Sequence, residues 1–231
     1  MNKFILILIL AVYMQASQSA LDAFKNKEYD KAYELYKVDA TRGDSVAQNA
    51  LSYLYFNGIG ISKDIKKGVY WLKKSAHNMD ATAQYDLAMM YLSGHYVKQD
   101  LNLAFTWLGS SADLGNANAQ YNLALMYYKG DFTDQNVTKA AELLESAALQ
   151  AHQGAIKNIG IVYMQLIKFD KALKWLKINA QSGDTNSYYL LAEVYCNQEN
   201  FSEAKTFAKK SIDSGNVYAK KLWDKYELSK Y

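Results

Sequence analysis

The sequence has no proline and only one cysteine, Cys196, among its 231 residues. Without proline, neither a polyproline II linker nor a collagen-like segment can form, and helices lack their strongest breaker. A single cysteine excludes an intrachain disulfide framework and a cluster of thiolate metal ligands. We therefore expect packing alone to stabilise the fold, with the Cys196 thiol partly buried and unreactive.

A strong charge of either sign is also missing. The sequence has 26 Lys and Arg residues against 23 Asp and Glu residues, which gives a formal net charge of +3. This excess is too small to indicate nucleic-acid binding by itself. Half of the residues are hydrophobic and 14% are aromatic, which is enough for a packed core and argues against a disordered chain.

One short hydrophobic run occurs at the N-terminus, over residues 4–12, between Lys3 and the small and polar residues 16–20. This order is typical of a secretory signal peptide, and the run is short for a transmembrane helix. We predict a signal peptide over residues 1–20, cleaved between Ala16 and Leu21, and one domain over residues 21–231 that is periplasmic or secreted. The alternative is an uncleaved N-terminal anchor.

The rest of the chain is built from a repeat. A segment that begins Ala-Gln and ends in tyrosine recurs at residues 47–55, 83–91 and 119–127, which are 36 residues apart. The last step, from Tyr163 to Tyr195, is 32 residues because the loop inside the repeat is shorter. Each copy carries two helical patterns with apolar spacings of three and four. Such periods indicate helix pairs that bury their faces by stacking.

The repeat pattern Ala-Gln-x-x-Leu-Ala-x-x-Tyr-x-x-Gly, followed by Lys-x-Asp and Ala-x-x-Trp-Leu, resembles the Sel-1-like repeat, a relative of the tetratricopeptide repeat. The later pairs, with residues 169–172 reading Phe-Asp-Lys-Ala, look closer to tetratricopeptide repeats. The resemblance covers essentially all of residues 21–231. It implies an all-α fold, a right-handed α-solenoid of about six helix-turn-helix repeats, and a binding scaffold with no particular partner specified.

Resemblance to tetratricopeptide proteins also implies which positions of each first helix face a concave groove. In the first three copies these positions are mostly aromatic. The candidate partner-binding residues are Tyr53, Phe56, Tyr85, Met89, Leu92, Tyr121, Leu125 and Tyr128. Tyrosine combines a large apolar area with a polar tip and is typical of binding hot spots. The alternative is that some of these side chains pack between repeats, as we expect for the series Tyr55, Tyr91, Tyr127, Tyr163 and Tyr195.

Catalytic and metal-binding patterns are missing from the sequence. The histidines His77, His95 and His152 are far apart, and neither a Gly-x-Ser-x-Gly elbow nor a phosphate-binding glycine loop occurs. The recurring carboxylates Asp64, Asp100 and Asp134 are interpreted as helix caps. We therefore predict no enzyme activity, no cofactor and no metal ion.

The leading hypothesis is a non-catalytic scaffold or adaptor, exported to the bacterial periplasm, that binds another protein in its groove. That partner is an envelope component or a secreted effector toxin; nucleic acid and an integral membrane segment after signal cleavage are not expected. A sharper alternative is an immunity protein against a periplasm-acting effector such as a lipase, a role that some small exported members of the Sel-1-like family have. Further alternatives are a β-lactamase-like protein and a cell-wall-binding protein. The β-lactamase branch of the family pairs cysteines within each repeat, a pattern from which this chain departs.

Overall fold

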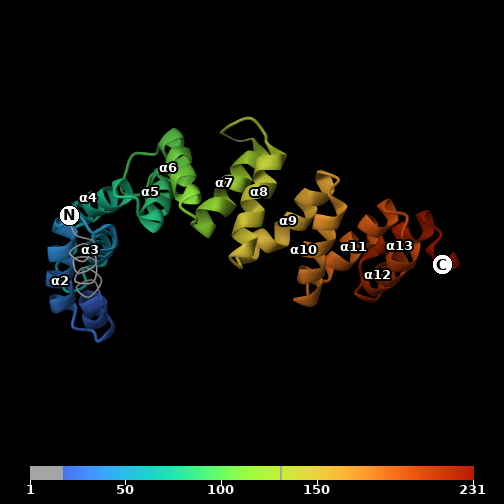
Figure 1. Ribbon diagram of the computed structural model, residues 1–231, viewed down its shortest axis with the longest axis horizontal. Coiled ribbons are helices and arrows are strands. Elements are labelled where there is room, and N and C mark those ends of the chain that lie inside the picture. The colour runs from blue at the N-terminus through green and yellow to red at the C-terminus, as the bar shows by residue number, and fades with distance from the viewer. Residues whose placement is uncertain (1–17, 131) are drawn as a thin grey trace, which may run out of the picture. The chain divides into compact units, whose positions relative to one another are not determined.

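The computed structural model describes residues 18–130 and 132–231, and all regular secondary structure in these residues is helical (Figure 1). A first helix covers residues 18–25. The elements that follow are α2 (Tyr29–Thr41), α3 (Ser45–Asn57), α4 (Ile65–His77), α5 (Ala81–Ser93), α6 (Leu101–Asp113), α7 (Ala117–Lys129), α8 (Val137–Leu149), α9 (Gln153–Gln165), α10 (Phe169–Gln181), α11 (Asn186–Asn197), α12 (Phe201–Asp213), α13 (Val217–Lys225) and the 3-10 helix η1 (Leu228–Lys230).

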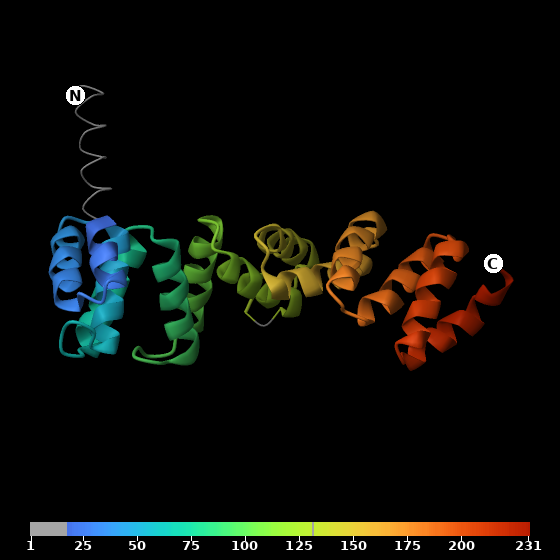
Figure 2. The same ribbon diagram turned by 90° about the horizontal axis from the view of Figure 1, so that it is seen from below.

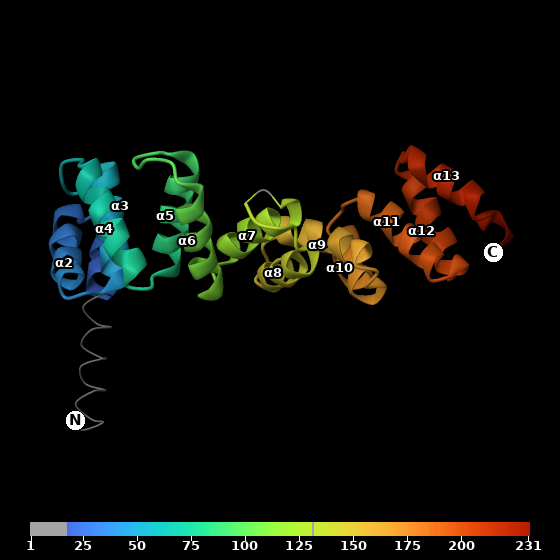
Figure 3. The ribbon, with the colours of Figure 1, turned by 90° about the horizontal axis from the view of Figure 1, so that it is seen from above.

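Consecutive helices pack in pairs. α3 packs against α4, α5 against α6, α9 against α10, and α11 against α12. Figure 3 shows the first two of these pairs. The first helix and α2 precede these pairs in the chain, and α7 and α8 follow α6. Residues 18–130 and 132–231 thus contain about six pairs followed by α13. This confirms the predicted all-α solenoid of helix-turn-helix repeats.

Residues 1–17, which include most of the predicted signal peptide, lie outside the described residues, so the signal peptide stays a prediction. Residues 18–25 form a helix, drawn in dark blue in Figure 2. Its Ala20 and Ala23 share a buried cluster with residues of α2. Within residues 18–130 and 132–231, no helix combines the length and the apolar character that a membrane span needs.

The chain divides into two compact units, residues 1–119 and 120–231, and the division falls inside α7. The first unit has one core cluster around Tyr33, Leu51 and Tyr55 and another around Leu72 and Leu87. In the second unit, a cluster near the C-terminus includes Ala192, Tyr195, Cys196 and Leu228. Of the tyrosine series predicted as core, Tyr55, Tyr163 and Tyr195 are buried, whereas Tyr91 and Tyr127 are half-buried.

Cys196 is buried in the second unit, which confirms the burial predicted for it. Burial, together with the negative charge of Glu193, raises the pKa of its thiol to about 11. Because the thiolate is the reactive form, a thiol with a raised pKa has low reactivity near neutral pH.

Polar side chains cap most of the helices and mark where they begin. Asp64 accepts a hydrogen bond from the Lys67 backbone N–H at 3.0 Å, and Asp100 accepts one from Leu103 at 3.0 Å, as predicted. The same prediction for Asp134 is wrong. Asn136, which lies 36 residues after Asp100, caps α8 through the Lys139 N–H at 2.9 Å. The third loop keeps its length, and the capping position within it carries an amide in place of a carboxylate.

Buried polar side chains join neighbouring helices. The Gln48 amide donates to the carbonyl oxygen of Ala40 at 3.0 Å, and Gln84 donates to Ala76 at the same distance. The Ser75 hydroxyl donates to the carbonyl oxygen of Ser45 at 2.7 Å. The two glutamine bonds each reach a backbone carbonyl near the end of the preceding helix and fix the next helix pair against it, whereas the Ser75 bond joins α4 to α3 within one pair.

Candidate functional site

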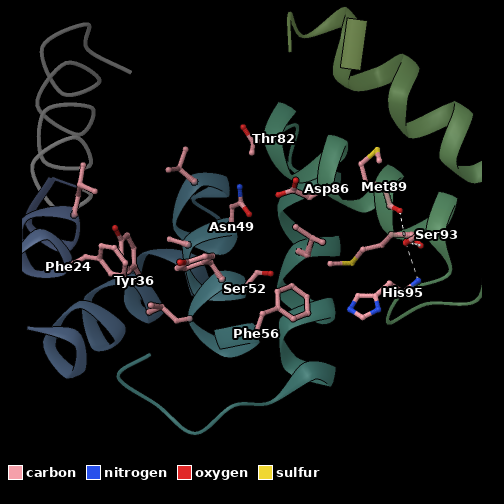
Figure 4. A pocket seen from close by; sticks show the side chains of 17 residues that line it. Phe24, Tyr36, Asn49, Ser52, Phe56, Thr82, Asp86, Met89, Ser93 and His95 are labelled. Atoms are coloured by element: carbon pink, nitrogen blue, oxygen red, sulfur yellow. Dashed lines mark hydrogen bonds between the residues drawn. The ribbon is translucent and has the colours of Figure 1, made fainter. Parts of the chain in front are cut away.

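A cavity of about 760 Å³ opens in the first unit between α3 and α5 (Figure 4). We call it the α3–α5 groove. Its lining residues are Val46, Asn49, Ala50, Ser52, Tyr53, Leu54 and Phe56 from α3, Thr82, Asp86, Met89, Met90 and Ser93 from α5, and Leu21, Phe24, Tyr36, Leu72 and His95 from the neighbouring segments. Most of these side chains are apolar or aromatic, as in sites that bind ligands by burial.

The two walls of the groove largely repeat each other at the 36-residue period. Four positions line it from both helices, as Val46, Ala50, Tyr53 and Leu54 on α3 and as Thr82, Asp86, Met89 and Met90 on α5. The walls differ at other positions: Asn49 and Phe56 line the groove from α3, whereas their equivalents Tyr85 and Leu92 are not among the lining residues. Many, but not all, equivalent positions of the repeat therefore line the groove.

Three of the eight predicted binding residues line the α3–α5 groove, namely Tyr53, Phe56 and Met89. Tyr85 and Leu92 are half-buried on α5 and are not among its lining residues. Tyr121, Leu125 and Tyr128 lie on α7 in the second unit, where each is half-buried. A binding role for these five residues stays a prediction.

The aromatic residues of the groove differ in accessibility. Tyr53 is 53% exposed, and its ring packs in a T-shaped arrangement with that of Phe24, with centroids 6.4 Å apart. Phe56 instead stacks on Tyr96 at 5.4 Å, and its ring lies so close to Gly68 that a Cβ there would meet it at 2.6 Å. Tyr53 thus presents an accessible aromatic surface, whereas Phe56 is held in place as part of the groove's base.

Tyr121 has a packing role inside the second unit. Its ring stacks on His152 with centroids 4.5 Å apart, and its hydroxyl accepts a hydrogen bond from the Asn158 amide at 3.3 Å. A Cβ at Gly154 would lie only 2.9 Å from the Tyr121 ring. The Tyr121 ring therefore packs between α7 and α9, as the alternative of packing between repeats describes, while its role in partner binding stays a prediction.

Asp86 introduces a carboxylate into this apolar groove and is not among the residues predicted from the sequence. Burial, followed by the negative charge of Asp80, raises the pKa of the half-buried Asp86 carboxyl above its usual value. The equivalent positions of the flanking repeats hold Ala50 and Asn122. The sequence signal that could have identified Asp86 is therefore its charge, at a position that is uncharged in the neighbouring repeats.

A second polar cluster lies in the second unit and is fully paired within itself. The Tyr163 hydroxyl and the Lys171 ammonium both donate to Glu145 Oε2, at 2.7 and 2.8 Å. Although burial opposes it, these hydrogen bonds hold the pKa of Glu145 below its usual value. The cluster joins α8, α9 and α10. Across the described parts of the chain, no group of three or more His, Cys, Asp or Glu residues could hold a metal ion.

Comparison with known proteins identifies the repeat. The sequence pattern of the Sel1 repeat matches three consecutive segments, residues 45–78, 81–116 and 117–152. These segments contain the pairs α3–α4, α5–α6 and α7–α8, so both walls of the α3–α5 groove come from Sel1 repeats. No curated protein matches the chain.

Solved structures support the same fold. A Sel1 repeat protein from Oxalobacter formigenes is 24% identical, with a TM-score of 0.68 over 89% of this chain and 88% of that one. The protein c5321, a protective antigen of uropathogenic Escherichia coli strains with an SLR fold, is 23% identical, with a TM-score of 0.50. That match covers 94% of this chain and 57% of c5321. At these identities, the likeness concerns the fold.

The immunity protein Pa5087 from Pseudomonas aeruginosa is also similar, at 18% identity over 91% of this chain and 83% of that protein. Its TM-score of 0.44 is too low to support an argument about shared architecture or role.

Proposed function

We propose that this chain is a protein-binding scaffold and that the α3–α5 groove holds a segment of its partner. The observation that carries the proposal is the groove itself, a cavity of about 760 Å³ with a half-exposed tyrosine and largely apolar walls. Exposed apolar surface in a recess is typical of an interaction site. The Sel1 repeats support the same function, because stacked helix pairs offer extended surfaces to other proteins.

Two side chains on opposite walls are suited to the energetics of binding. Tyr53 on α3 contributes a large ring with a polar tip, and Met89 on α5 contributes a flexible thioether that adapts to the shape of a partner. Hot-spot side chains of this kind cost about 2 kcal/mol or more of binding free energy when they are truncated. Removing both should therefore weaken binding far more than removing a residue outside the groove.

The test compares what co-purifies with the full-length chain from its native cells, identified by mass spectrometry. The double variant Tyr53→Ala/Met89→Ala should lose a partner protein that the wild-type chain retains. Tyr70→Ala is a matched control, because Tyr70 is 51% exposed on α4 and is not among the groove's lining residues. Retention of all partners by the double variant, or equal loss with Tyr70→Ala, would contradict the proposal.

We further propose that the chain is exported, with residues 1–20 as the signal peptide and a periplasmic or secreted partner. The order of charge, apolar run and small residues at the N-terminus supports this. Cell fractionation with N-terminal sequencing of the recovered protein should find a first residue between Ser17 and Leu21. A chain that begins at Met1 and fractionates with the cytosol would contradict export.

The identity of the co-purified protein also separates two roles. A hydrolase of effector type, recovered in equal amounts with the chain, would favour an immunity protein. An envelope or secretion component would favour an adaptor.

A further inference from the structure

We propose that the α3–α5 groove selects a partner segment that carries a lysine or arginine among apolar residues, and that Asp86 pairs with this cation. The inference rests on the function proposed above and specifies the chemistry of the partner. It makes Asp86 the specificity-determining residue of the groove.

The position of Asp86 supports this role. It lies on α5 one helical turn from both Thr82 and Met90, and all three line the groove. Figure 4 shows its carboxylate extending into the space between α5 and α3. A partner segment lying between the two helices would pass this carboxylate.

The charges around Asp86 leave it without a counterion. No residue in the described part of the chain forms a hydrogen bond or an ion pair with its side chain. Neither lysine nor arginine lines the groove; the other titratable lining groups are Tyr36, Tyr53 and His95. The charge that raises its pKa in addition to burial is that of Asp80, which has the same sign. A cation is therefore the charge that this groove lacks.

The fold itself does not require a carboxylate at this position. The repeats on either side carry Ala50 and Asn122 there and form the same helices. Asp80, by contrast, has a local role because it caps α5 through the Ala83 N–H at 2.7 Å and accepts a bond from the Asn49 amide at 3.3 Å. A half-buried carboxylate without a partner destabilises a folded protein. A cation supplied by a bound segment removes that penalty.

Apolar contacts would contribute affinity for the partner segment, and the carboxylate would contribute specificity. Burial of the segment's apolar side chains against the groove supplies affinity, and a partly desolvated charge pair excludes segments without a cation. An arginine or lysine stem also packs well against methionine and tyrosine while its charged end reaches a carboxylate.

The test uses a phage-displayed library of random peptides, selected separately on the full-length wild-type chain, on Asp86→Asn and on Tyr53→Ala. Sequences selected on the wild type should enrich one Lys or Arg between apolar residues. Those selected on Asp86→Asn should keep the apolar residues and lose the basic one. A synthetic peptide selected on the wild type should bind Asp86→Asn at least tenfold more weakly, and its Lys→Met analogue should bind both proteins equally.

The outcomes separate this inference from the function on which it rests. Apolar peptides that depend on Tyr53 but show no preference for a basic residue would overturn the role of Asp86 alone. Failure to enrich peptides on the wild type, or enrichment that Tyr53→Ala leaves unchanged, would overturn the groove as a binding site.

The melting temperature of the free protein distinguishes a binding role of Asp86 from a structural one. It should rise in Asp86→Asn if the carboxylate is unpaired, and fall if the carboxylate stabilises the fold. Asp86→Asn should raise the melting temperature relative to Asp113→Asn, which removes the same charge from an exposed position on α6. A lower melting temperature for Asp86→Asn than for Asp113→Asn would show that the carboxylate supports the fold, and would overturn the proposal.

Discussion

One buried polar atom in the first unit lacks a partner for a reason visible in the repeat. Gln84 Oε1 is buried and accepts no hydrogen bond from any described residue. In the preceding repeat, Asn78 Nδ2 donates to Gln48 Oε1 at 2.9 Å, and in the following repeat Gln150 Nε2 donates to Gln120 Oε1 at 2.9 Å. The donor positions are 36 residues apart, and the middle one is Leu114.

We predict that Leu114→Gln raises the free energy of unfolding by about 1 kcal/mol. A buried acceptor without a partner costs about 1–3 kcal/mol, so a new donor recovers about 2 kcal/mol. The hydrophobic burial lost with the leucine side chain costs less than this, because Leu114 is already 41% exposed and glutamine keeps its Cβ and Cγ. The lost burial amounts to roughly one CH₂ group, or about 0.8 kcal/mol. Leu114 is the C-cap of α6, as Asn78 is of α4 and Gln150 is of α8, so the backbone is compatible.

Urea unfolding followed by circular dichroism measures the effect. Leu149→Gln serves as the control, since Leu149 is 69% exposed at the end of α8. The gain should disappear in a Gln84→Ala background, which removes the acceptor. The reasoning is refuted if Leu114→Gln is no more stable than Leu149→Gln, or if its gain persists when Gln84 is absent.

Two further predictions concern the backbone of the first unit and its pH dependence. Gly60 has φ +67°, and a Cβ there would lie 2.4 Å from the Tyr29 carbonyl oxygen. Gly60→Ala should therefore lower the melting temperature far more than Gly43→Ala, where nothing lies within 4 Å of the added carbon; equal effects would contradict the contact. The folded state raises the pKa of Asp86 and of Asp80, so these two carboxyls bind more protons in the folded than in the unfolded state. Their contribution to the free energy of unfolding should fall as pH rises from the ordinary carboxyl pKa through these raised values, and the contribution of Asp86 should be missing from Asp86→Asn. A pH profile of that variant identical to the wild type would exclude Asp86 as a cause.

The repeat made the fold predictable, because the same sequence pattern occurs several times in the chain. Successive copies repeat the tyrosine, and several repeat a capping residue, so a weak signal such as Asp64 gains weight when Asp100 recurs at the same spacing. The one wrong prediction of a helix cap arose where the residue type at the capping position changes from aspartate to asparagine. Asp134 has the expected chemistry, but Asn136 stands at the repeat position and binds the exposed N–H of α8.

The groove was less predictable, because a periodic sequence does not say which side of each helix faces its neighbour. Applying one register to every copy found Tyr53 on the first wall and Met89 on the second. It selected Tyr85, which is not among the lining residues, and missed Asp86 beside it. The proposed role of Asp86 rests on its burial and on the absence of a counterion. Both depend on neighbouring side chains that only the folded structure brings together.

The central claim is that a partner protein lies in the α3–α5 groove, and site-specific photo-crosslinking in the native cells tests it most directly. A photoreactive phenylalanine analogue, such as benzoylphenylalanine, would replace Tyr53 in one strain and Tyr70 in another. Tyr53 lines the groove, whereas Tyr70 has similar exposure on α4 and is not a lining residue. We predict one discrete protein adduct from position 53 that is missing from position 70. No adduct at position 53, or the same adducts at both positions, would contradict the account.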